Sequence, residues 1–473
     1  MAALSVVATL TALVAQAPID VEIREIEFTT REGPRVTTRV GEGFLTVPER
    51  WEAPGGRSIR IHFLRFRSTN PNPGAPIVYL AGGPGGSGSF SAAGDRFPLF
   101  QALREVADVI ALDQRGVYGS DPYLVCPGDY DLPLDAPRNP GRDTPILEAF
   151  ARRCSEHFRA QGVDLAAYHT LASADDLEAL RRALGAERLN LWAISYGTHL
   201  ALAMIRRHPG SVERAVLAGV EGTDHTLKLP SAMDRVFMRF DSVVRADPRT
   251  RAFLPDPAGT VRRLLEELRR EPRVVRRGRR QITIGPLDLQ ELLVGQMGER
   301  PDYVDLPRRI AAVARGEWGE VADAVAGRRT DQRRLAMSIS VDCASGASPD
   351  RLARIDRERD ASLLGDAVNF PFPAICVGWP HNDLGPDFRA AVRSDVPVLF
   401  ISGTLDVRTP FENAEEVAAG FPNGRHLVIE GGSHDDDLFL SSPHIVAAMR
   451  IFFARGTPDV TRIALPPIGF RRP

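Results

Sequence analysis

Leu189-Asn190-Leu191-Trp192-Ala193-Ile194-Ser195-Tyr196-Gly197-Thr198 is the stretch that decides the fold of this 473-residue chain. Its apolar first half predicts a buried strand, and the spacing of apolar residues from Thr198 to His208 predicts a helix. Ser195 therefore lies in a tight strand-to-helix turn, which strains its backbone and exposes its hydroxyl. Ala193 and Gly197 are small, as expected where a helix folds back on its strand. Such a pattern also arises by chance, so the rest of the chain has to supply chemical partners.

A glycine-rich loop follows an earlier apolar run. Residues 76–80 predict a buried strand that leads into Ala81-Gly82-Gly83-Pro84-Gly85-Gly86-Ser87-Gly88. With few side chains, the backbone N–H groups of this loop can approach a ligand closely. A phosphate cradle is one interpretation, but the Gly-Lys-Ser/Thr ending of a P-loop is absent. We favour an oxyanion hole, with the N–H groups of Gly83 and Tyr196 as donors.

Two further loops carry an acid and a base. The strand expected at 396–401 leads to Asp406, and the strand expected at 426–429 leads to His434. Ligands of an open parallel sheet bind beyond the carboxyl ends of its strands. The order Ser195, Asp406, His434 is that of an α/β-hydrolase triad. We expect Ser195 to be the nucleophile, His434 the base and Asp406 the acid that orients it.

Other residues are weaker candidates for these roles. The rival histidines, His208 and His444, end a helix or lie within one. The rival carboxylates, Asp383 and Asp395, follow no expected strand.

Strands that alternate with helices predict an α/β fold with a mainly parallel sheet covered by helices. Residues 43–47 and 59–67 predict an opening hairpin, and 109–112 and 215–219 predict further strands. After the strand at 109–112, Asp113 and Arg115 are expected to pair and support the following turn. A helix is expected from Ser173, its cap, to Gly185.

From about residue 220 the pattern changes to helical spacing without clear strand alternation. We therefore expect residues 18–219 and 396–473 to form the catalytic core, and residues 220–395 to form a mostly helical cap.

The composition narrows the class of protein. The chain is 43% hydrophobic and 25% charged with a net charge of -2, as in an ordinary soluble globular protein, and nothing indicates a nucleic-acid partner. Lys228 is the only lysine. The arginines of Arg269 to Arg280 are better explained by a solvated surface than by a polyanion site. Neither a metal nor an organic cofactor is required by the expected chemistry.

The amino terminus and the cysteines indicate export. Residues 2–15 carry no charge and are followed by a small-residue cleavage pattern, so residues 1–17 predict an export signal. This run is too short to predict a permanent membrane anchor. The four cysteines form two local pairs, Cys126 with Cys154 and Cys343 with Cys376, which predict disulfides in an oxidising compartment. Four unpaired buried thiols are the alternative.

Four motifs resemble the proline iminopeptidase and tripeptidyl aminopeptidase branch of the α/β-hydrolase serine peptidases. They are Gly82-Gly83-Pro84-Gly85-Gly86, Asp113-Gln114-Arg115-Gly116, Ser195-Tyr196-Gly197-Thr198, and Gly403-Thr404-Leu405-Asp406 followed by Thr409-Pro410. The paired cysteines and signal-like start are similar to the secreted tripeptidyl-aminopeptidase-like members. Ala81 and Ala193 depart from the usual histidine and glycine, but both are small. The resemblance implies removal of residues from free peptide amino termini.

The same resemblance implies that carboxylates of the cap region bind the substrate ammonium group. Glu221 is the first candidate for this role and Asp224 the second, and His381 and Asp383 are further possible cap contacts. An ordinary solvated carboxylate is the alternative for Glu221.

Three hypotheses follow for the function. The first is an exported serine aminopeptidase that acts on short peptides through an acyl-enzyme. The second is a carboxylesterase or amidase acting on small acyl substrates with the same chemistry. The third is a non-catalytic binding protein on the same fold, which the intact triad disfavours.

Overall fold

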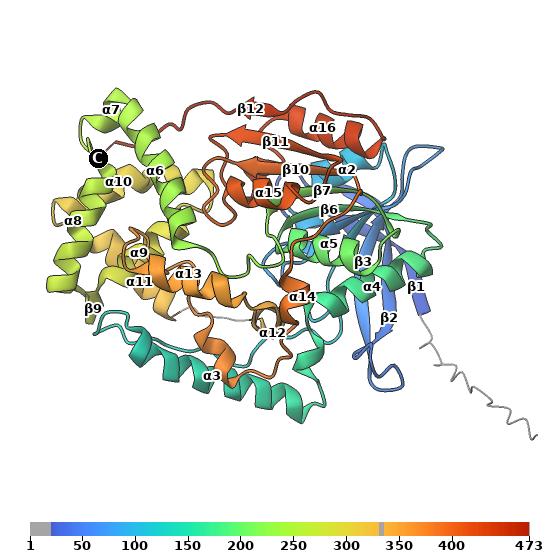
Figure 1. The fold of residues 1–473 in the computed structure, drawn as a ribbon, viewed down its shortest axis with the longest axis horizontal. Coiled ribbons are helices and arrows are strands. Elements are labelled where there is room, and N and C mark those ends of the chain that lie inside the picture. The colour runs from blue at the N-terminus through green and yellow to red at the C-terminus, as the bar shows by residue number, and fades with distance from the viewer. Residues whose placement is uncertain (1–19, 331–334, 473) are drawn as a thin grey trace, which may run out of the picture.

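A ten-stranded sheet forms the centre of the molecule (Figure 1). The computed structural model describes residues 20–330 and 335–472, so the predicted export signal lies outside the described residues. In sheet order the strands are β1 (Asp20–Thr29), β2 (Thr37–Pro48), β3 (Ser58–Phe66), β5 (Val109–Leu112), β4 (Ile77–Leu80), β6 (Leu189–Ser195), β7 (Val212–Val220), β10 (Val398–Gly403), β11 (Gly424–Glu430) and β12 (Arg462–Ala464).

The sheet is mainly parallel, as predicted. Neighbouring strands from β5 to β12 all pair in parallel, whereas β1, β2, β3 and β5 pair antiparallel. The predicted opening hairpin is confirmed as β2 and β3. The edge strands β1 and β12 were not predicted, because the charged sequence of β1 and the shortness of β12 give little strand signal.

The inner strands β4, β5, β6, β7 and β10 are apolar on both faces because helices cover both. In β4, Val78 and Leu80 pack on one face while Ile77 and Tyr79 pack on the other, which is the period-two alternation of a strand. The helices packed on the Tyr79 face are α1 (Gly88–Ala93), α2 (Phe97–Leu103) and α16 (Pro443–Phe453). Those contributing to the Leu80 face are α3 (Pro140–Ala160), α4 (Thr170–Ala183), α5 (Tyr196–Arg207) and α15 (Phe411–Ala418).

Two local expectations on this side were wrong. Helix α4 begins one turn before Ser173, and its cap is His169, whose Nδ1 accepts a hydrogen bond from the N–H of Ala172. Arg115 does not pair with Asp113. Its guanidinium instead bonds both carboxylate oxygens of Asp176 in α4, at 2.8 and 2.6 Å. Both side chains are buried, so the pair ties the turn after β5 to the helix layer.

The region between β7 and β10 is mostly helical. Its helices are α6 (Pro230–Ala246), α7 (Pro248–Arg251), α8 (Pro257–Arg270), α9 (Pro286–Gln296), α10 (Arg300–Ala314), α11 (Gly319–Thr330), α12 (Ala336–Ser345), α13 (Pro349–Arg359) and α14 (Gly385–Arg389). Figure 1 shows α6 to α11 gathered at one end of the molecule, beside the central sheet. They share a hydrophobic cluster that includes Phe237, Leu265 and Tyr303 and that also takes in Leu405 and Val407 after β10.

The mostly helical region contains a hairpin that was not predicted, at the arginine-rich segment. Strands β8 (Arg273–Arg277) and β9 (Arg280–Ile284) form a two-stranded antiparallel hairpin. Its turn contains Gly278 with φ +60°, a conformation that glycine adopts readily. The arginines of β8 and of its turn are exposed, as expected for a solvated surface.

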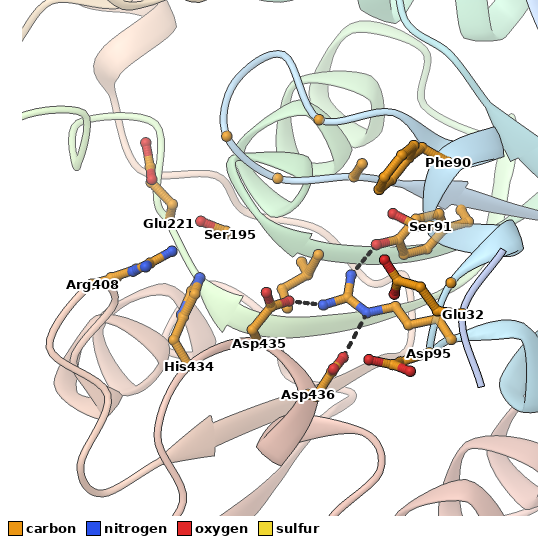
Figure 2. Close-up of a pocket in the computed structure, with 18 of the residues that line it drawn as sticks. Glu32, Phe90, Ser91, Asp95, Ser195, Glu221, Arg408, His434, Asp435 and Asp436 are labelled. Atoms are coloured by element: carbon orange, nitrogen blue, oxygen red, sulfur yellow. Dashed lines mark hydrogen bonds and ion pairs between the residues drawn. The ribbon is translucent and has the colours of Figure 1, made fainter. Parts of the chain in front are cut away.

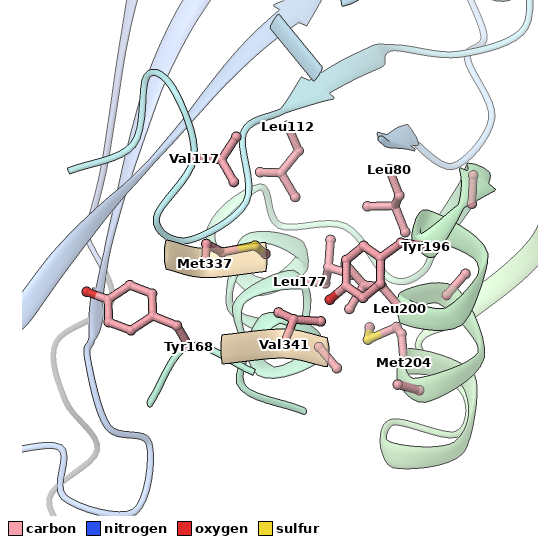
Figure 3. Packing of buried hydrophobic residues seen from close by; sticks show 14 of the residues in the cluster. Leu80, Leu112, Val117, Tyr168, Leu177, Tyr196, Leu200, Met204, Met337 and Val341 are labelled. Carbon is pink, nitrogen blue, oxygen red and sulfur yellow. The ribbon is translucent and has the colours of Figure 1, made fainter. Parts of the chain in front are cut away.

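Helices α12 and α14 pack with the sheet instead of with α6 to α11. Met337 and Val341 of α12 and Phe388 of α14 belong to the cluster on the Leu80 face. Figure 3 shows Met337 and Val341 among the side chains of Tyr168 and Leu177. Residues 220–395 thus contribute to two hydrophobic clusters, and their division from the core as one cap stays a prediction.

Two disulfides close local loops, with the predicted pairing. Cys126 in the loop after β5 bonds to Cys154 of α3, and Cys343 of α12 bonds to Cys376 in a short 3₁₀ turn (Ala374–Gly378). Bridges that close loops of this size typically contribute roughly 2–4 kcal/mol to stability. Among the described helices, none combines the length and apolar character needed to cross a membrane.

Candidate active site

Ser195 occupies a strained turn between β6 and α5. Its φ and ψ are 54° and −128°, a conformation that residues other than glycine rarely adopt, and this confirms the predicted strain. Gly197 has to be glycine because an added Cβ would lie 2.1 Å from the carbonyl oxygen of Leu80. Gly197 thus lies close to the neighbouring strand β4. The sequence predicted a small residue here only because α5 folds back over its own strand, β6.

Thr198 ties this turn to the end of β7. Its Oγ1 donates to the carbonyl oxygen of Ser195 at 2.7 Å and accepts from the N–H of Glu221 at 2.8 Å. The hydroxyl is fully buried within helix α5. The nucleophile turn and the backbone of Glu221 are thus held in a fixed relation.

The acid and base follow β10 and β11, as predicted. The Nδ1 of His434 lies 2.8 Å from Oδ2 of Asp406, and Asp406 is completely buried. Asp406 also accepts hydrogen bonds from Thr409 Oγ1 at 2.7 Å and from the N–H groups of Thr409 and Arg408. These donors fix the carboxylate, which in turn selects the imidazole tautomer with a proton on Nδ1 and a free electron pair on Nε2.

Space for the imidazole is made by a glycine. Gly219, near the end of β7, has φ +56°, and a Cβ there would lie 3.0 Å from Cε1 of His434. A side chain at this position would displace the ring as well as strain the backbone.

Residues from the helical region brace the loops of both acid and base. The N–H of His434 donates to the carbonyl oxygen of Gly298 at 3.2 Å, and Tyr303 OH donates to the carbonyl oxygen of Leu405 at 2.7 Å. Burial raises the pKa of Tyr303 well above its usual value, so the phenol stays a proton donor. Sequence reasoning missed these contacts, because no local pattern signals a bond between residues more than one hundred positions apart.

Ser195 and His434 line one open cavity of about 470 Å³, together with residues of the glycine loop (Figure 2). The loop approaches the nucleophile closely, since a Cβ on Gly82 would lie 2.8 Å from Cβ of Ser195. Gly83 lines the same cavity and has φ +119°. Tyr196 is the first residue of α5, so its N–H belongs to the first turn, whose donors have no partner within the helix. The oxyanion hole formed by Gly83 and Tyr196 stays a prediction.

Asp113 anchors the far end of the glycine loop. Its buried carboxylate accepts hydrogen bonds from Ser87 Oγ and Ser89 Oγ, at 2.5 and 2.6 Å, and lies 2.8 Å from His62 Nδ1. Asp113 and Arg115 are thus both structural supports, as expected, but they support different elements.

Glu221 lies in the cavity, beside the only lysine of the chain, Lys228. Glu221 is 5% exposed, and its Oε2 lies 2.9 Å from Nζ of Lys228. Lys228 also donates to the carbonyl oxygens of His225 and Thr226, at 2.8 and 3.1 Å. Both Glu221 and Lys228 line the cavity. Sequence reasoning did not select Lys228, although its being the only lysine of the chain is a signal that could have drawn attention to it.

The other candidate amine-binding residues do not line this cavity. Both carboxylate oxygens of Asp224 bond to Ser348, at the start of α13, each at 2.6 Å. Asp383 pairs with Arg389, and the ring of His381 bonds to the carbonyl oxygen of Trp379. These side chains have structural partners elsewhere, so the structure does not bring them together with Ser195.

The opposite wall of the cavity was not predicted. It contains Phe90, Asp95 and Arg96, together with the two aspartates that follow His434. Arg96 is 8% exposed and forms ion pairs with both Asp435 and Asp436 (Figure 2). This arginine joins the loop of the base to the segment between α1 and α2.

Comparison with known proteins agrees with this geometry. The chain is 25% identical over 464 residues to a protein named tripeptidyl aminopeptidase from Streptomyces lividans, covering 91% of this chain and 84% of that protein. It is 24% identical over 438 residues to serine protease Hip1 from Mycobacterium tuberculosis, covering 83% and 81%. A shorter match, 32% identical over 156 residues, covers 32% of this chain and 34% of a probable proline iminopeptidase from Streptomyces coelicolor.

The family assignment rests on a match to a family model. A family model described as alpha/beta hydrolase fold matches residues 75–438, which include the glycine loop, the serine turn and the loops of acid and base. The sheet order, the strained serine and the buried Asp406–His434 pair are what this fold requires. The chain belongs to the alpha/beta hydrolase fold family.

Proposed function

We propose that this protein is a serine aminopeptidase that releases residues from free peptide amino termini through an acyl-enzyme. The observation that carries the proposal is the buried carboxylate of Glu221 in the same cavity as Ser195. A buried carboxylate provides a binding group for an ammonium ion. An esterase acting on small uncharged acyl groups has no need of one there.

In this mechanism Ser195 Oγ attacks the scissile carbonyl carbon while His434 Nε2 accepts the hydroxyl proton. The N–H groups of Gly83 and Tyr196 stabilise the oxyanion of the tetrahedral intermediate. His434 then protonates the departing amine, the C–N bond breaks and an ester to Ser195 remains. Water attacks this ester with His434 again as base. The C–O bond to Ser195 then breaks, His434 returns the proton to Ser195 Oγ, and the acid is released. Asp406 stabilises the imidazolium that forms in each half-reaction.

The ion pair with Lys228 leaves one oxygen of the Glu221 carboxylate for a cationic substrate. Lys228 Nζ pairs with Oε2 of Glu221 and is held in place by the carbonyl oxygens of His225 and Thr226. We propose that Oε1 receives the substrate ammonium group while Lys228 holds the carboxylate in place. The names of the tripeptidyl aminopeptidase and proline iminopeptidase relatives support this class of substrate.

The test is a panel of fluorogenic amides of proline, alanine and tripeptides, each with a free and an acetylated amino terminus, alongside short acyl esters. We expect free tripeptidyl or prolyl amides to be cleaved and acetylated ones to be poor substrates. Glu221→Gln should raise KM for free-amine substrates about 10- to 100-fold, because a charge-assisted bond is lost. The solvated Glu266→Gln is the matched control.

Cleavage of acetylated amides in preference to free ones would contradict the aminopeptidase proposal. An unchanged KM in Glu221→Gln would remove that residue from the binding site.

We also propose that the protein is exported. The signal-like residues 1–17 and the two disulfides support this, since disulfides persist in oxidising compartments. Thiol titration of the denatured, unreduced protein isolated from its natural host should find no free thiol. Four free thiols would contradict export.

A further inference from the structure

The exposed aromatic side chains of this protein are gathered in one place. Of its 22 Phe, 7 Tyr and 4 Trp, all within the described residues, the ones that are exposed are Phe90, Tyr118 and Tyr123. Their exposed fractions are 48%, 37% and 47%. The rings contact one another in sequence, with centroids 6.0 Å apart for Phe90 and Tyr118 and 6.3 Å apart for Tyr118 and Tyr123. We call these three side chains the aromatic strip.

The aromatic strip begins at the candidate active site. Phe90 lines the cavity that contains Ser195 and His434. Figure 2 shows Phe90 and Glu221 on opposite sides of Ser195. If the substrate amino terminus binds at Glu221, the residues beyond the scissile bond leave the cavity on the Phe90 side.

The strip is held rigid by buried and charged partners. Asp113 accepts hydrogen bonds from the N–H and Oγ of Ser89, next to Phe90, and from the N–H of Gly119, next to Tyr118. One buried carboxylate thus fixes the backbone on both sides of the first ring contact. Arg31 adds a bond to Tyr118 OH at 2.6 Å, and its guanidinium lies 5.4 and 5.6 Å from the rings of Phe90 and Tyr118.

The spacing of the rings fits an extended peptide. Side chains two residues apart on one face of an extended chain are separated by roughly 6.6–6.8 Å. The ring spacings of 6.0 and 6.3 Å are close to that repeat. Exposed aromatic rings prefer apolar and aromatic partners, and a contiguous exposed apolar patch marks a binding surface.

We propose that the aromatic strip binds the leaving segment of a peptide substrate, with a preference for apolar or aromatic side chains at two positions two residues apart. This inference rests on the proposed aminopeptidase function. It adds that the preferred substrates are peptides extending several residues beyond the scissile bond.

The experiment compares three substrates that share one free tripeptide as the acyl part. The first has an aminocoumarin leaving group, the second a four-residue leaving segment with two phenylalanines two residues apart, and the third the same segment with two serines. We expect kcat/KM for the phenylalanine peptide to exceed that for the serine peptide by three- to tenfold.

Strip variants test where this preference originates. Phe90→Ala, Tyr118→Asn and Tyr123→Ser should bring the ratio of the two peptides close to one. Asparagine is chosen because Tyr118 has φ +40°, a conformation that asparagine tolerates. Met238→Ala on α6 removes an equally exposed apolar side chain far along the chain and should leave the ratio unchanged.

The outcomes separate the two proposals. If the wild type cleaves the aminocoumarin amide but its peptide ratio is near one, the strip proposal is overturned and the proposed function stands. A preference for the phenylalanine peptide that survives in Tyr118→Asn and Tyr123→Ser also overturns the strip proposal. A kcat/KM ratio near one in the wild type is the result expected if the strip binds a protein partner instead of the substrate. If no free tripeptidyl substrate is cleaved, the proposed function fails and this proposal falls with it. Should a variant fail to fold, the wild-type comparison of the two peptides still decides.

Discussion

Single glycines decide how closely the catalytic loops of this protein approach each other. Gly82 faces Ser195, Gly197 faces β4 and Gly219 faces His434, each at a distance that leaves no room for a Cβ. The need for a small residue at 197 is predictable from a strand-to-helix turn. The need at Gly82 and Gly219 is not, because it depends on which loops become neighbours in the sheet.

Gly82→Ala tests this contact at the scale of one methyl group. The new Cβ would lie 2.8 Å from Cβ of Ser195 and 3.1 Å from the carbonyl oxygen of Ile194, so the glycine loop or the nucleophile has to shift. Misplacement of reacting groups by about 1 Å can reduce turnover about 100-fold. We expect kcat on a tripeptidyl amide to fall by about that factor, as measured by steady-state kinetics.

The matched control is Gly55→Ala, where a Cβ would meet nothing within 4 Å. Its kcat should equal that of the wild type. A fully active Gly82→Ala would show that the loop does not approach the nucleophile in the working enzyme.

At the scale of elements, strands were more predictable than the contacts between them. The apolar runs before Ser195, Asp406 and His434 are strands β6, β10 and β11. Strands β6 and β10 are buried on both faces, whereas β11 buries only the face that carries Leu427 and Ile429. Arg115 was expected to pair with its neighbour Asp113 but pairs with Asp176, since long-range packing and not proximity in sequence selects a buried partner. The hairpin of β8 and β9 was missed because arginines obscure its alternation.

The start of α4 makes stability depend on pH. Burial, and then the charge of Arg115, lower the pKa of His169 to about 4. Unfolding restores an ordinary histidine pKa of about 6.5, so the unfolded chain binds the proton first as the pH falls. The contribution of His169 is complete above about pH 6.5 and is lost progressively down to about pH 4. At pH 5 the loss amounts to roughly 2 kcal/mol.

His169→Asn keeps an oxygen cap for the N–H of Ala172 but removes the titrating ring. Urea unfolding at pH 7 and pH 5 should therefore show a smaller decrease in the free energy of unfolding for this variant than for the wild type. The exposed His444→Asn should behave like the wild type. Equal decreases in His169→Asn and the wild type would show that His169 is not the group responsible.

At the scale of the whole molecule, the helical region contacts the loops that carry the candidate catalytic residues. Gly298 and Tyr303 bond the loops of His434 and Asp406, and Ser338 of α12 donates to the carbonyl oxygen of Pro84 in the glycine loop. The fold and the candidate triad were predictable because they follow from strand order and from loops at strand ends. The amine-binding candidates were less so: Asp224 bonds to Ser348, which only the folded chain brings near, and Asp383 pairs with Arg389, six residues further on.

The measurement that tests the central claim most directly is covalent labelling by a fluorophosphonate, read by intact-protein mass and peptide mapping. The reagent reacts with a serine that an adjacent histidine activates. We predict one adduct per chain, on Ser195, with labelling slowed about 10³- to 10⁴-fold in Asp406→Asn, because the tautomer of His434 is then no longer held. Absence of an adduct, or an adduct that persists in Ser195→Ala, would contradict the account.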